Sequence, residues 1–442
     1  MTEAVKNRGW QVTLSGLGIN LALGVLYSWS VISAEIGKAG WAWSDSAFAK
    51  SLPYSVACFV FCLTMVPAGR MQDKLSPKIV ASIGGLLVGI GMIFASLVDP
   101  TQSSLGYVIG FGVIAGAGIG FGYAAATPPA VKWFPKAKTG MIAGIVVCGF
   151  GLAPVYTSYL CKWLAGFGLN TMMMALGIGF LIVVGGLAQL LVPPPPGFVP
   201  EGEVTKKKTQ KAPSKEDFTP SEMLKTWQFF VLWFMYACGA GAGLMVISSC
   251  KGIVTGAGVS EAAALAAVAF LAIGNGGGRV VAGALSDKLG RNKTMLLFFL
   301  LQALVIFGLS VASSMQVPSA LLLIVLATLV GANYGSNLAL FPSITKDYFG
   351  SKNFGVNYGL IFTAWGIGGL TLSMFAAKVK DGSITWLGSQ WAGNYNFAFY
   401  TASVLLLLGA LLTFVVKAPD HEKKEDPAPT LKGAMARASQ VL

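Results

Sequence analysis

The sequence predicts an all-α membrane protein in which twelve transmembrane helices form two halves of six helices each. Three observations support this prediction: an apolar composition, twelve separate apolar runs, and two motifs that recur half a chain apart. Of the 442 residues, 55% are hydrophobic and 11% are charged, whereas soluble domains carry about 25% charged residues. A chain this apolar needs lipid as its solvent, so we expect a multi-pass protein of the cell membrane, most simply a monomer.

The apolar runs define the expected spans, since a transmembrane helix needs about 20 mostly apolar residues. The first half, 1–192, contains runs at 11–33, 47–68, 79–98, 104–127, 138–161 and 170–192. The second half, 228–417, contains runs at 228–253, 260–285, 294–313, 318–343, 354–378 and 394–417. Residues 193–227 open with four prolines, which cannot continue a helix, and are predicted to be a cytoplasmic linker. Residues 418–442 are predicted to be a cytoplasmic tail.

Two motifs echo each other between the halves. Gly69 to Lys78 follows the second span, and Gly283 to Arg291 follows the eighth, at an offset of 214 residues. Trp133-Phe134 and Tyr348-Phe349 form a second echo at an offset of 215. Two echoes at nearly one offset indicate duplicated halves in parallel orientation.

The basic residues predict the orientation, because cytoplasmic loops carry an excess of Lys and Arg. With a cytoplasmic N-terminus, 24 of the 31 basic residues lie on the cytoplasmic side, and Arg279 lies inside a span. The other six lie outside: Lys38, Lys50, Lys162, Lys251, Lys378 and Lys380. Both termini are therefore expected to be cytoplasmic.

Several function classes are excluded at this stage. The net charge of +13 follows membrane topology rather than a folded basic face, so nucleic acid is not an expected partner. The single histidine, His421, lies in the polar tail, and the six cysteines lie in or beside apolar runs without metal-ligand spacing. We expect no metal, no cofactor and no enzyme activity; the lipid bilayer is the expected surrounding.

The loop after the eighth span resembles the signature of the major facilitator superfamily through Gly283, Asp287, Lys288, Gly290, Arg291 and Lys293. The first copy departs from it, with Ser76-Pro77 where Gly-Arg is usual. The resemblance covers the whole chain and implies the major facilitator fold. Three segments are more specifically similar to the oxalate/formate antiporter family, a group related to the monocarboxylate transporters: Gly24–Trp29, Asn275–Arg279 and Lys132–Pro135.

Arg279 is the strongest candidate for a substrate ligand. It lies eight residues before Asp287, which places it about 12 Å inside a core of about 30 Å. A buried arginine costs about 2.5–3.5 kcal/mol on insertion scales and marks function by default. All 18 acidic residues lie in loops, tails or helix ends, so a ligand carboxylate is favoured over a structural ion pair.

Other predicted substrate contacts surround Arg279. Asn275, one turn away, could orient the guanidinium or bind the solute; the intervening glycines fit either helix bending or close packing. Tyr123 and Tyr334 occupy roughly equivalent places in spans 4 and 10, where related proteins carry cavity tyrosines; packing roles are an equal alternative. Phe362 and Trp365, with Leu26 and Cys148 opposite, are expected to form an apolar wall.

Span 11 departs from the oxalate antiporters, which carry a lysine where this chain has Trp365. A single buried cation favours a monocarboxylate such as lactate, pyruvate or formate. Span 1 also lacks the lysine of mammalian-type carriers, and Asn275 replaces their aspartate. The alternatives of proton symport and anion exchange therefore stay open, and protons are a conditional second partner beside the small organic anion.

The resemblance to the major facilitator superfamily implies that the loop motifs form a gate. Asp73 and Lys74 in the first copy, and Asp287, Lys288 and Arg291 in the second, are expected to stabilise the outward-open state by bonds across the cytoplasmic face. Setting the topology alone is the simpler role. Two other functions stay open: exchange of oxalate or another dicarboxylate, and carboxylate sensing without transport.

Overall fold

The computed structural model describes residues 7–135, 139–195, 198–200, 217–350, 353–384 and 391–419, without the side chains of residues 73, 74, 139 and 140. Within this part of the chain, 12 helical segments are long and apolar enough to cross a membrane. The expected number of spans is confirmed, although several helices extend beyond the predicted apolar runs. Span 10, for example, continues to Phe349 because its last turns are amphipathic rather than apolar.

The first half contains six spans, of which three are built from more than one helical piece. Span 1 comprises α1 (Gly9–Leu23), the 3₁₀ turn η1 (Gly24–Ser28) and α2 (Trp29–Ile36). Spans 2 and 3 are α3 (Ala47–Lys74) and α4 (Pro77–Leu97). Span 4 comprises α5 (Leu105–Tyr107), the π-helical η2 (Val108–Ala115) and α6 (Gly116–Val131). Span 5 comprises α7 (Thr139–Leu152) and α8 (Pro154–Ala165), and span 6 is α9 (Leu169–Ala188).

The second half follows a short helix, α10 (Pro220–Met223), and its spans are single helices. They are α11 (Trp227–Gly256), α12 (Glu261–Leu289), α13 (Arg291–Ser313), α14 (Ala320–Phe349), α15 (Phe354–Lys380) and α16 (Asn396–Val415). Several start at serine or threonine side chains that accept a hydrogen bond from the first helical turn, as Ser260 does from Ala263 N. Such caps satisfy backbone donors that a helix start leaves unpaired.

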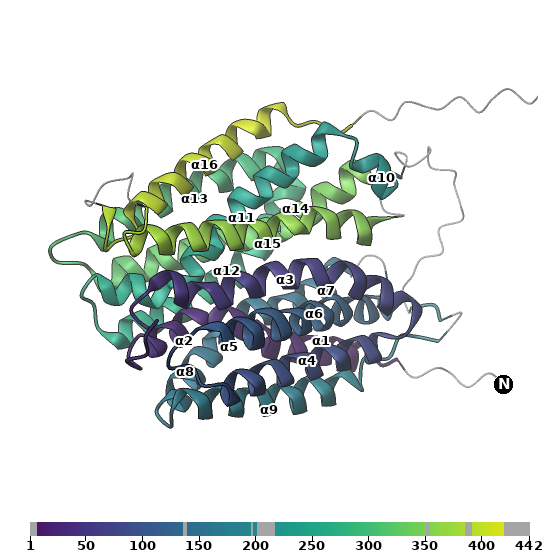
Figure 1. Ribbon diagram of the computed structural model, residues 1–442. Helices are drawn as coiled ribbons and strands as arrows, with labels where there is room; N and C mark the ends of the chain where they lie inside the picture. Colours follow the sequence, from purple (N-terminus) through teal and green to yellow (C-terminus); the bar gives the residue numbers. More distant parts are fainter. Residues whose placement is uncertain are drawn as a thin grey trace, which may run out of the picture.

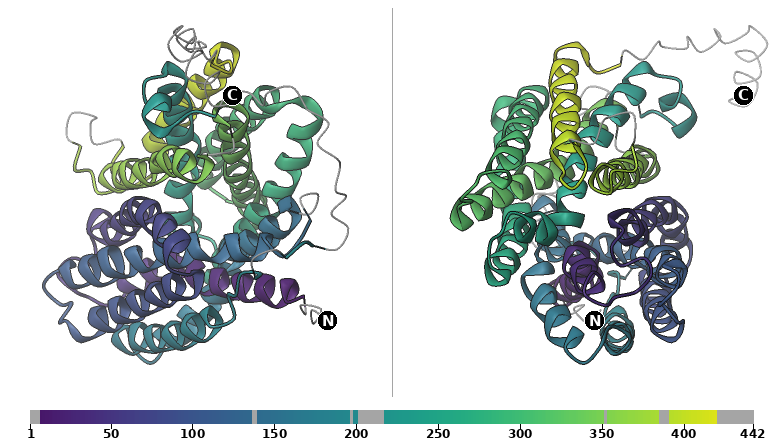
Figure 2. Two further views of the ribbon diagram at one scale, coloured as in Figure 1. Left: turned by 90° about the vertical axis from the view of Figure 1, so that its right-hand side faces the viewer. Right: turned by 60° about the vertical axis from the view of Figure 1, so that its left-hand side comes forward.

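The two groups of six helices lie one above the other in Figure 1, purple to blue below and teal to yellow above. The views in Figure 2 show the same two groups from the side. Between them, α3 packs along α15, α12 packs against α7 and α8, and α2 packs against α11. The domain boundaries at 192, 227 and 417 stay a prediction, because nothing in the arrangement of helices tests the exact residues.

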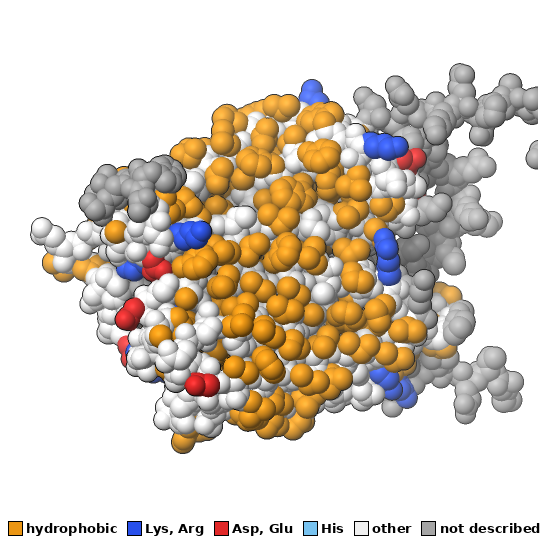
Figure 3. Space-filling model, in the orientation of Figure 1, with side chains coloured by type: hydrophobic (Ala, Val, Ile, Leu, Met, Phe, Trp, Pro, Cys, Tyr) orange, Lys and Arg blue, Asp and Glu red, His pale blue; other side chains and the backbone are white. Residues whose placement is uncertain are grey.

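One face of the molecule carries a wide hydrophobic band, with charged side chains at its two ends (Figure 3). This distribution matches a bilayer that covers the middle of the helices. We call the end near Gly9 and α10 the linker end. The opposite end, which holds Glu35, Glu261 and Asp381, is the distal end.

Helices α12 and α14 approach each other through small residues. A Cβ added at Gly274 or Gly278 of α12 would meet the backbone of Thr328 or Ala332 of α14. In the same way, Gly331 and Gly335 of α14 face the backbone of α12. Two pairs of glycines spaced four residues apart therefore bring the backbones together, as in membrane helix dimers, and fix α12 within its half.

Candidate functional site

Arg279 projects from α12 toward the other half of the molecule. Its Nη1 donates a hydrogen bond of 3.1 Å to the backbone carbonyl of Val147 in α7. Its Nε and Nη2 both donate to Asn275 Oδ1, each at 3.2 Å. The guanidinium is therefore held between the halves by neutral oxygens. Asn275 contacts it as the one-turn spacing allowed, and its orienting role stays a prediction.

No carboxylate compensates the Arg279 charge among the described residues. The ion pairs recorded there involve Glu35, Glu261, Asp287 and Asp347, and their basic partners are Lys38, Lys162, Lys251 and Arg291. A guanidinium carries five donors and suits a planar anion that accepts two of them. Arg279 is thus a half-buried cation with donor capacity to spare.

Four phenol groups lie within electrostatic reach of the guanidinium. Electrostatic interactions connect Arg279 with Tyr27, Tyr123, Tyr334 and Tyr358, and with the thiol of Cys148. These five groups come from both halves of the chain. The structure therefore brings the predicted residues Tyr123, Tyr334 and Cys148 to one place.

Tyr334 is the centre of a hydrogen-bonded group that joins the halves. Its hydroxyl lies 2.5 Å from the Tyr27 hydroxyl in η1 and accepts a 2.7 Å hydrogen bond from Trp365 Nε1 in α15. All three side chains are at most 3% exposed. Trp365 is consequently not only the apolar wall that its position suggested, because its indole N–H also fixes the Tyr334 hydroxyl.

The remaining wall is aromatic. Phe362 stacks on Trp365 with ring centroids 5.1 Å apart. Phe61 of α3 lies 5.1 Å from Trp365 and 5.4 Å from Tyr123, so it bridges the two halves. Phe150 of α7 continues the wall from Tyr123 at 5.3 Å to Tyr27 at 4.9 Å.

Two breaks in the helices lie beside this aromatic wall. Span 5 is interrupted at Ala153, where Pro154 starts a new helix because proline lacks the donor needed within one. Span 1 is interrupted at Gly24, whose missing Cβ leaves room for Phe150 O and Ala153 Cβ. The breaks meet each other and place Tyr27 opposite Tyr334. Broken helices of this kind line the binding sites of many transporters.

Leu26 and the three glycines between Asn275 and Arg279 differ in what they pack against. Leu26 is fully buried in η1, one position before Tyr27. Gly278 packs on α14, which fits the close-packing role, whereas Gly276 faces Leu152 and Gly277 has no neighbour within 4 Å. Helix α12 runs unbroken through these glycines, so they thin the helix without ending it.

Several site residues were not predicted. Tyr27 lies within Gly24–Trp29, a segment that carries the family resemblance, so a signal for it existed; Tyr358 lies in span 11, seven residues before Trp365. Phe61 and Phe150 stand in apolar runs without any distinguishing pattern. Only tertiary packing shows that these two phenylalanines belong to the site.

Lys251 differs from its expected surroundings. Its charge was expected outside the membrane with five other lysines, and it does lie at the distal end. Its side chain is nevertheless only 1% exposed, and its Nζ lies 2.7 Å from Glu35 and 2.9 Å from Glu261. Lys251 is therefore a second buried cation, but its charge is compensated by two carboxylates.

The loop motif of the second half makes contacts within that half. Arg291 pairs with Asp287 at 2.8 Å and with Asp347, at the end of α14, also at 2.8 Å. Lys288 is exposed. The side chains of Asp73 and Lys74 lie outside the described residues. The expected bonds across the cytoplasmic face stay a prediction. They would form in a state in which the two halves close against each other at the linker end.

Comparisons with known proteins agree with the fold. The sequence profile described as Major Facilitator Superfamily matches residues 11–373, and again 258–440. The "Oxalate:formate antiporter" of Oxalobacter formigenes is 29% identical over 423 residues, which cover 94% of this chain and 93% of that protein. "Apicoplast pyruvate carrier 1" of Toxoplasma gondii is 25% identical over 409 residues, covering 78% of this chain and 68% of that protein.

A solved structure has a similar fold. It is a bacterial homolog of the human lysosomal transporter Spinster in an inward-facing, unoccupied conformation, with a TM-score of 0.65 and 16% identity. The alignment covers 93% of this chain and 97% of that one.

The Tyr27–Tyr334 contact is open to a double-mutant cycle. Tyr334→Phe leaves a buried hydroxyl and an indole N–H without a partner, so we expect it to lower the free energy of unfolding by about 1–3 kcal/mol. Tyr27→Phe is expected to cost less, and the double variant less than the sum. Unfolding by SDS in mixed micelles measures these energies. Tyr400→Phe, at a ring outside the site, is the control; strictly additive losses would contradict the contact.

Proposed function

Because this chain belongs to the major facilitator superfamily, we propose that it carries a small monocarboxylate such as lactate, pyruvate or formate across the cell membrane. The observation that supports this most is Arg279: a cation between the halves, hydrogen-bonded to neutral oxygens and ion-paired to no described residue. One carboxylate supplies the missing negative charge. The chain is a secondary transporter related to the oxalate:formate antiporter.

The aromatic wall favours an anion with one charge. A dicarboxylate needs a second cation in contact with the solute. Lys251 has a buried ammonium group, but it lies at the distal end and is already paired with Glu35 and Glu261. At the place of the lysine in oxalate antiporters, Trp365 contributes a ring that stacks on Phe362. An apolar ring suits a short alkyl group or a hydrogen atom better than a second carboxylate.

We propose alternating access around this site, with both termini and the linker in the cytoplasm. The orientation rests on the distribution of Lys and Arg. The halves are joined by ion pairs at the distal end, whereas the ion pairs recorded for the described residues toward the linker end lie within the second half. These facts support a state in which the site opens toward the cytoplasm.

The charge balance around Arg279 also bears on which ion the transport is coupled to. Without a described acid beside Arg279, the substrate carboxylate is the group that compensates the guanidinium. Return of the empty carrier would leave that charge exposed to a low-dielectric interior, which is unfavourable. This argument supports exchange of one anion for another, while symport with a proton carried by the acid itself is the alternative mode.

Exchange of oxalate is the second candidate function, because a relative named for it aligns along nearly the whole chain. It would require the dicarboxylate to bind Arg279 with one end and neutral donors with the other. Tyr27, Tyr334 and the Trp365 N–H are already bonded to one another. Because these donors already have partners, the arrangement favours oxalate exchange less than transport of a monocarboxylate.

Arg279→Gln tests the charge of the site. The variant keeps a polar side chain but removes the cation, so we expect saturable uptake of lactate, pyruvate and formate to fall by about two orders of magnitude or more, as for loss of a buried charge partner. Uptake of labelled acids into proteoliposomes, with and without a pH gradient, is the measurement. Lys225→Gln, an exposed change of the same charge, is the control. Undiminished uptake in Arg279→Gln would refute the assignment.

Trp365→Lys tests whether Trp365 makes the site select an anion with a single charge. A lysine in the aromatic wall supplies the second cation, so oxalate should gain affinity relative to formate, by roughly tenfold for one added ion pair. Counterflow of labelled formate against unlabelled oxalate measures the ratio. Trp365→Phe separates loss of the indole from gain of charge, and a native thermal transition establishes folding. An unchanged preference in the folded lysine variant would argue against Trp365 as the selective residue.

A further inference from the structure

Asn275 has hydrogen-bonding capacity that the protein does not use. Its side chain is fully buried, and its Oδ1 accepts both bonds from Arg279. Its Nδ2 has no hydrogen-bond partner. A buried amide donor left without a partner is costly, so a ligand is the natural acceptor for it.

The free amide and the guanidinium present their donors at the same place. A Cβ built on Gly151 of α7 would lie 3.2 Å from Asn275 Nδ2 and 3.2 Å from Arg279 Nη2. Both donors therefore face the bare backbone of Gly151. Any larger residue at that position would cover them.

We infer that Gly151 is a specificity-determining residue, whose missing side chain leaves room for one carboxylate to accept hydrogen bonds from Arg279 Nη2 and Asn275 Nδ2 together. This inference rests on the proposed function and adds the second donor and the residue that sets the space. A charged donor and a neutral donor together match the two oxygens of a single carboxylate. The subsite thus distinguishes carboxylates from halides and other spherical anions.

Gly151→Ala tests the inference, with Gly144→Ala as a matched control two turns away on the same helix, where a Cβ meets nothing. We expect Gly151→Ala to raise the KM for formate and lactate about tenfold, with a smaller effect on kcat. Gly144→Ala should leave both unchanged. In an Asn275→Ala background, the effect of Gly151→Ala should shrink, because the amide that it would cover is gone.

The outcomes separate this inference from the proposed function. If the unaltered protein shows no saturable uptake of any monocarboxylate, the proposed function fails. If it does, and Gly151→Ala keeps the original KM, only the Gly151 inference fails. A folding defect would lower kcat and thermal stability without the dependence on Asn275, and this also counts against the inference.

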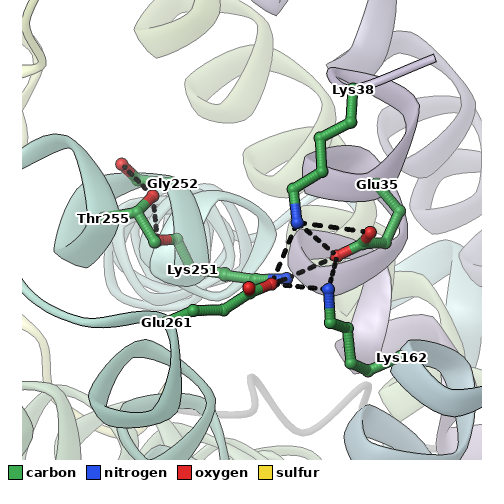
Figure 4. Close-up of polar contacts among 7 residues, drawn as sticks. All are labelled: Glu35, Lys38, Lys162, Lys251, Gly252, Thr255 and Glu261. Atoms are coloured by element: carbon green, nitrogen blue, oxygen red, sulfur yellow. Dashed lines mark hydrogen bonds and ion pairs between the residues drawn. The ribbon is translucent and has the colours of Figure 1, made fainter.

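A second, independent observation concerns five charged residues at the distal end, the distal cluster: Glu35, Lys38, Lys162, Lys251 and Glu261. They point toward one another from both halves (Figure 4). Three ion pairs cross between the halves: Lys251–Glu35 at 2.7 Å, Lys162–Glu261 at 2.7 Å and Lys38–Glu261 at 3.0 Å. All the ion pairs between halves recorded for the described residues belong to this cluster.

Three other ion pairs lie within one half. Lys38 and Lys162 each pair with Glu35 in the first half, at 3.2 and 3.1 Å, and Lys251 pairs with Glu261 in the second half at 2.9 Å. Every charge in the cluster therefore keeps a partner if the halves separate. This pairing matters most for Lys251, because an unpaired ammonium in its buried position would be costly.

We propose that the distal cluster is a reversible gate, whose crossing ion pairs hold the distal end closed and whose pairs within each half leave every charge with a partner when it opens. Asp381, directly after α15, adds a neighbouring link: it accepts bonds from the backbone N–H groups of Ala47 at 2.6 Å and Phe48 at 2.8 Å in α3. Glu261 takes part in two of the three crossing ion pairs and Glu35 in one. The two glutamates are thus unequal in holding the gate.

Pulsed EPR distances across the distal end test the gate. Spin labels at Ala42 and Thr255, in a chain free of its native cysteines and placed in lipid nanodiscs, report the separation of the halves. We expect Glu261→Gln to populate the long distance most, Glu35→Gln less, and Asp99→Asn, an exposed acid at the same end, not at all. Equal distributions in all variants, or a larger effect of Glu35→Gln, would overturn the proposal.

Discussion

The uncompensated charge of Arg279 is the constraint on which the architecture of the site depends. A guanidinium within a membrane span needs polar partners, and here Asn275 and the Val147 carbonyl accept three hydrogen bonds from it. The bond to Val147 crosses to the other half, so the cation belongs to the interface rather than to one half. A solute anion that replaces the Val147 contact would change both the charge balance and the tie between the halves. The proposed function would thus link binding and conformational change through one side chain.

The surrounding structure supports that side chain from several directions. Glycines on α12 and α14 bring the two backbones together, which leaves α12 little freedom to shift within its half. The interruptions at Gly24 and Ala153 bring span 1 and span 5 into contact and position Tyr27 against Tyr334. At the far end of the same helices, the paired charges of the distal cluster join the halves. A rigid site between two bodies, with bonds between them that can break, is what rocking of two halves requires.

Composition and periodicity were sufficient to predict the number of spans, because membrane helices must satisfy their backbone internally and need a minimum apolar length. Arg279 was predictable as well, because an arginine within an apolar run of transmembrane length is rare. Phe61 and Phe150 were not, since a phenylalanine in an apolar helix has the same sequence signature whether it meets lipid, core or substrate. Lys251 was assigned to the outside from charge counting, which gives the end of a helix but not the burial of a side chain or its ion pairs.

The central claim is that one uncompensated cation selects an anion with one carboxylate. Competition in counterflow tests it most directly: proteoliposomes loaded with labelled formate are diluted into equal concentrations of unlabelled formate, lactate, pyruvate or oxalate. The account predicts that the three monocarboxylates drive exchange of the label and that oxalate does so at least about tenfold less effectively, as expected for a second carboxylate without a charge partner. Exchange driven best by oxalate would contradict it.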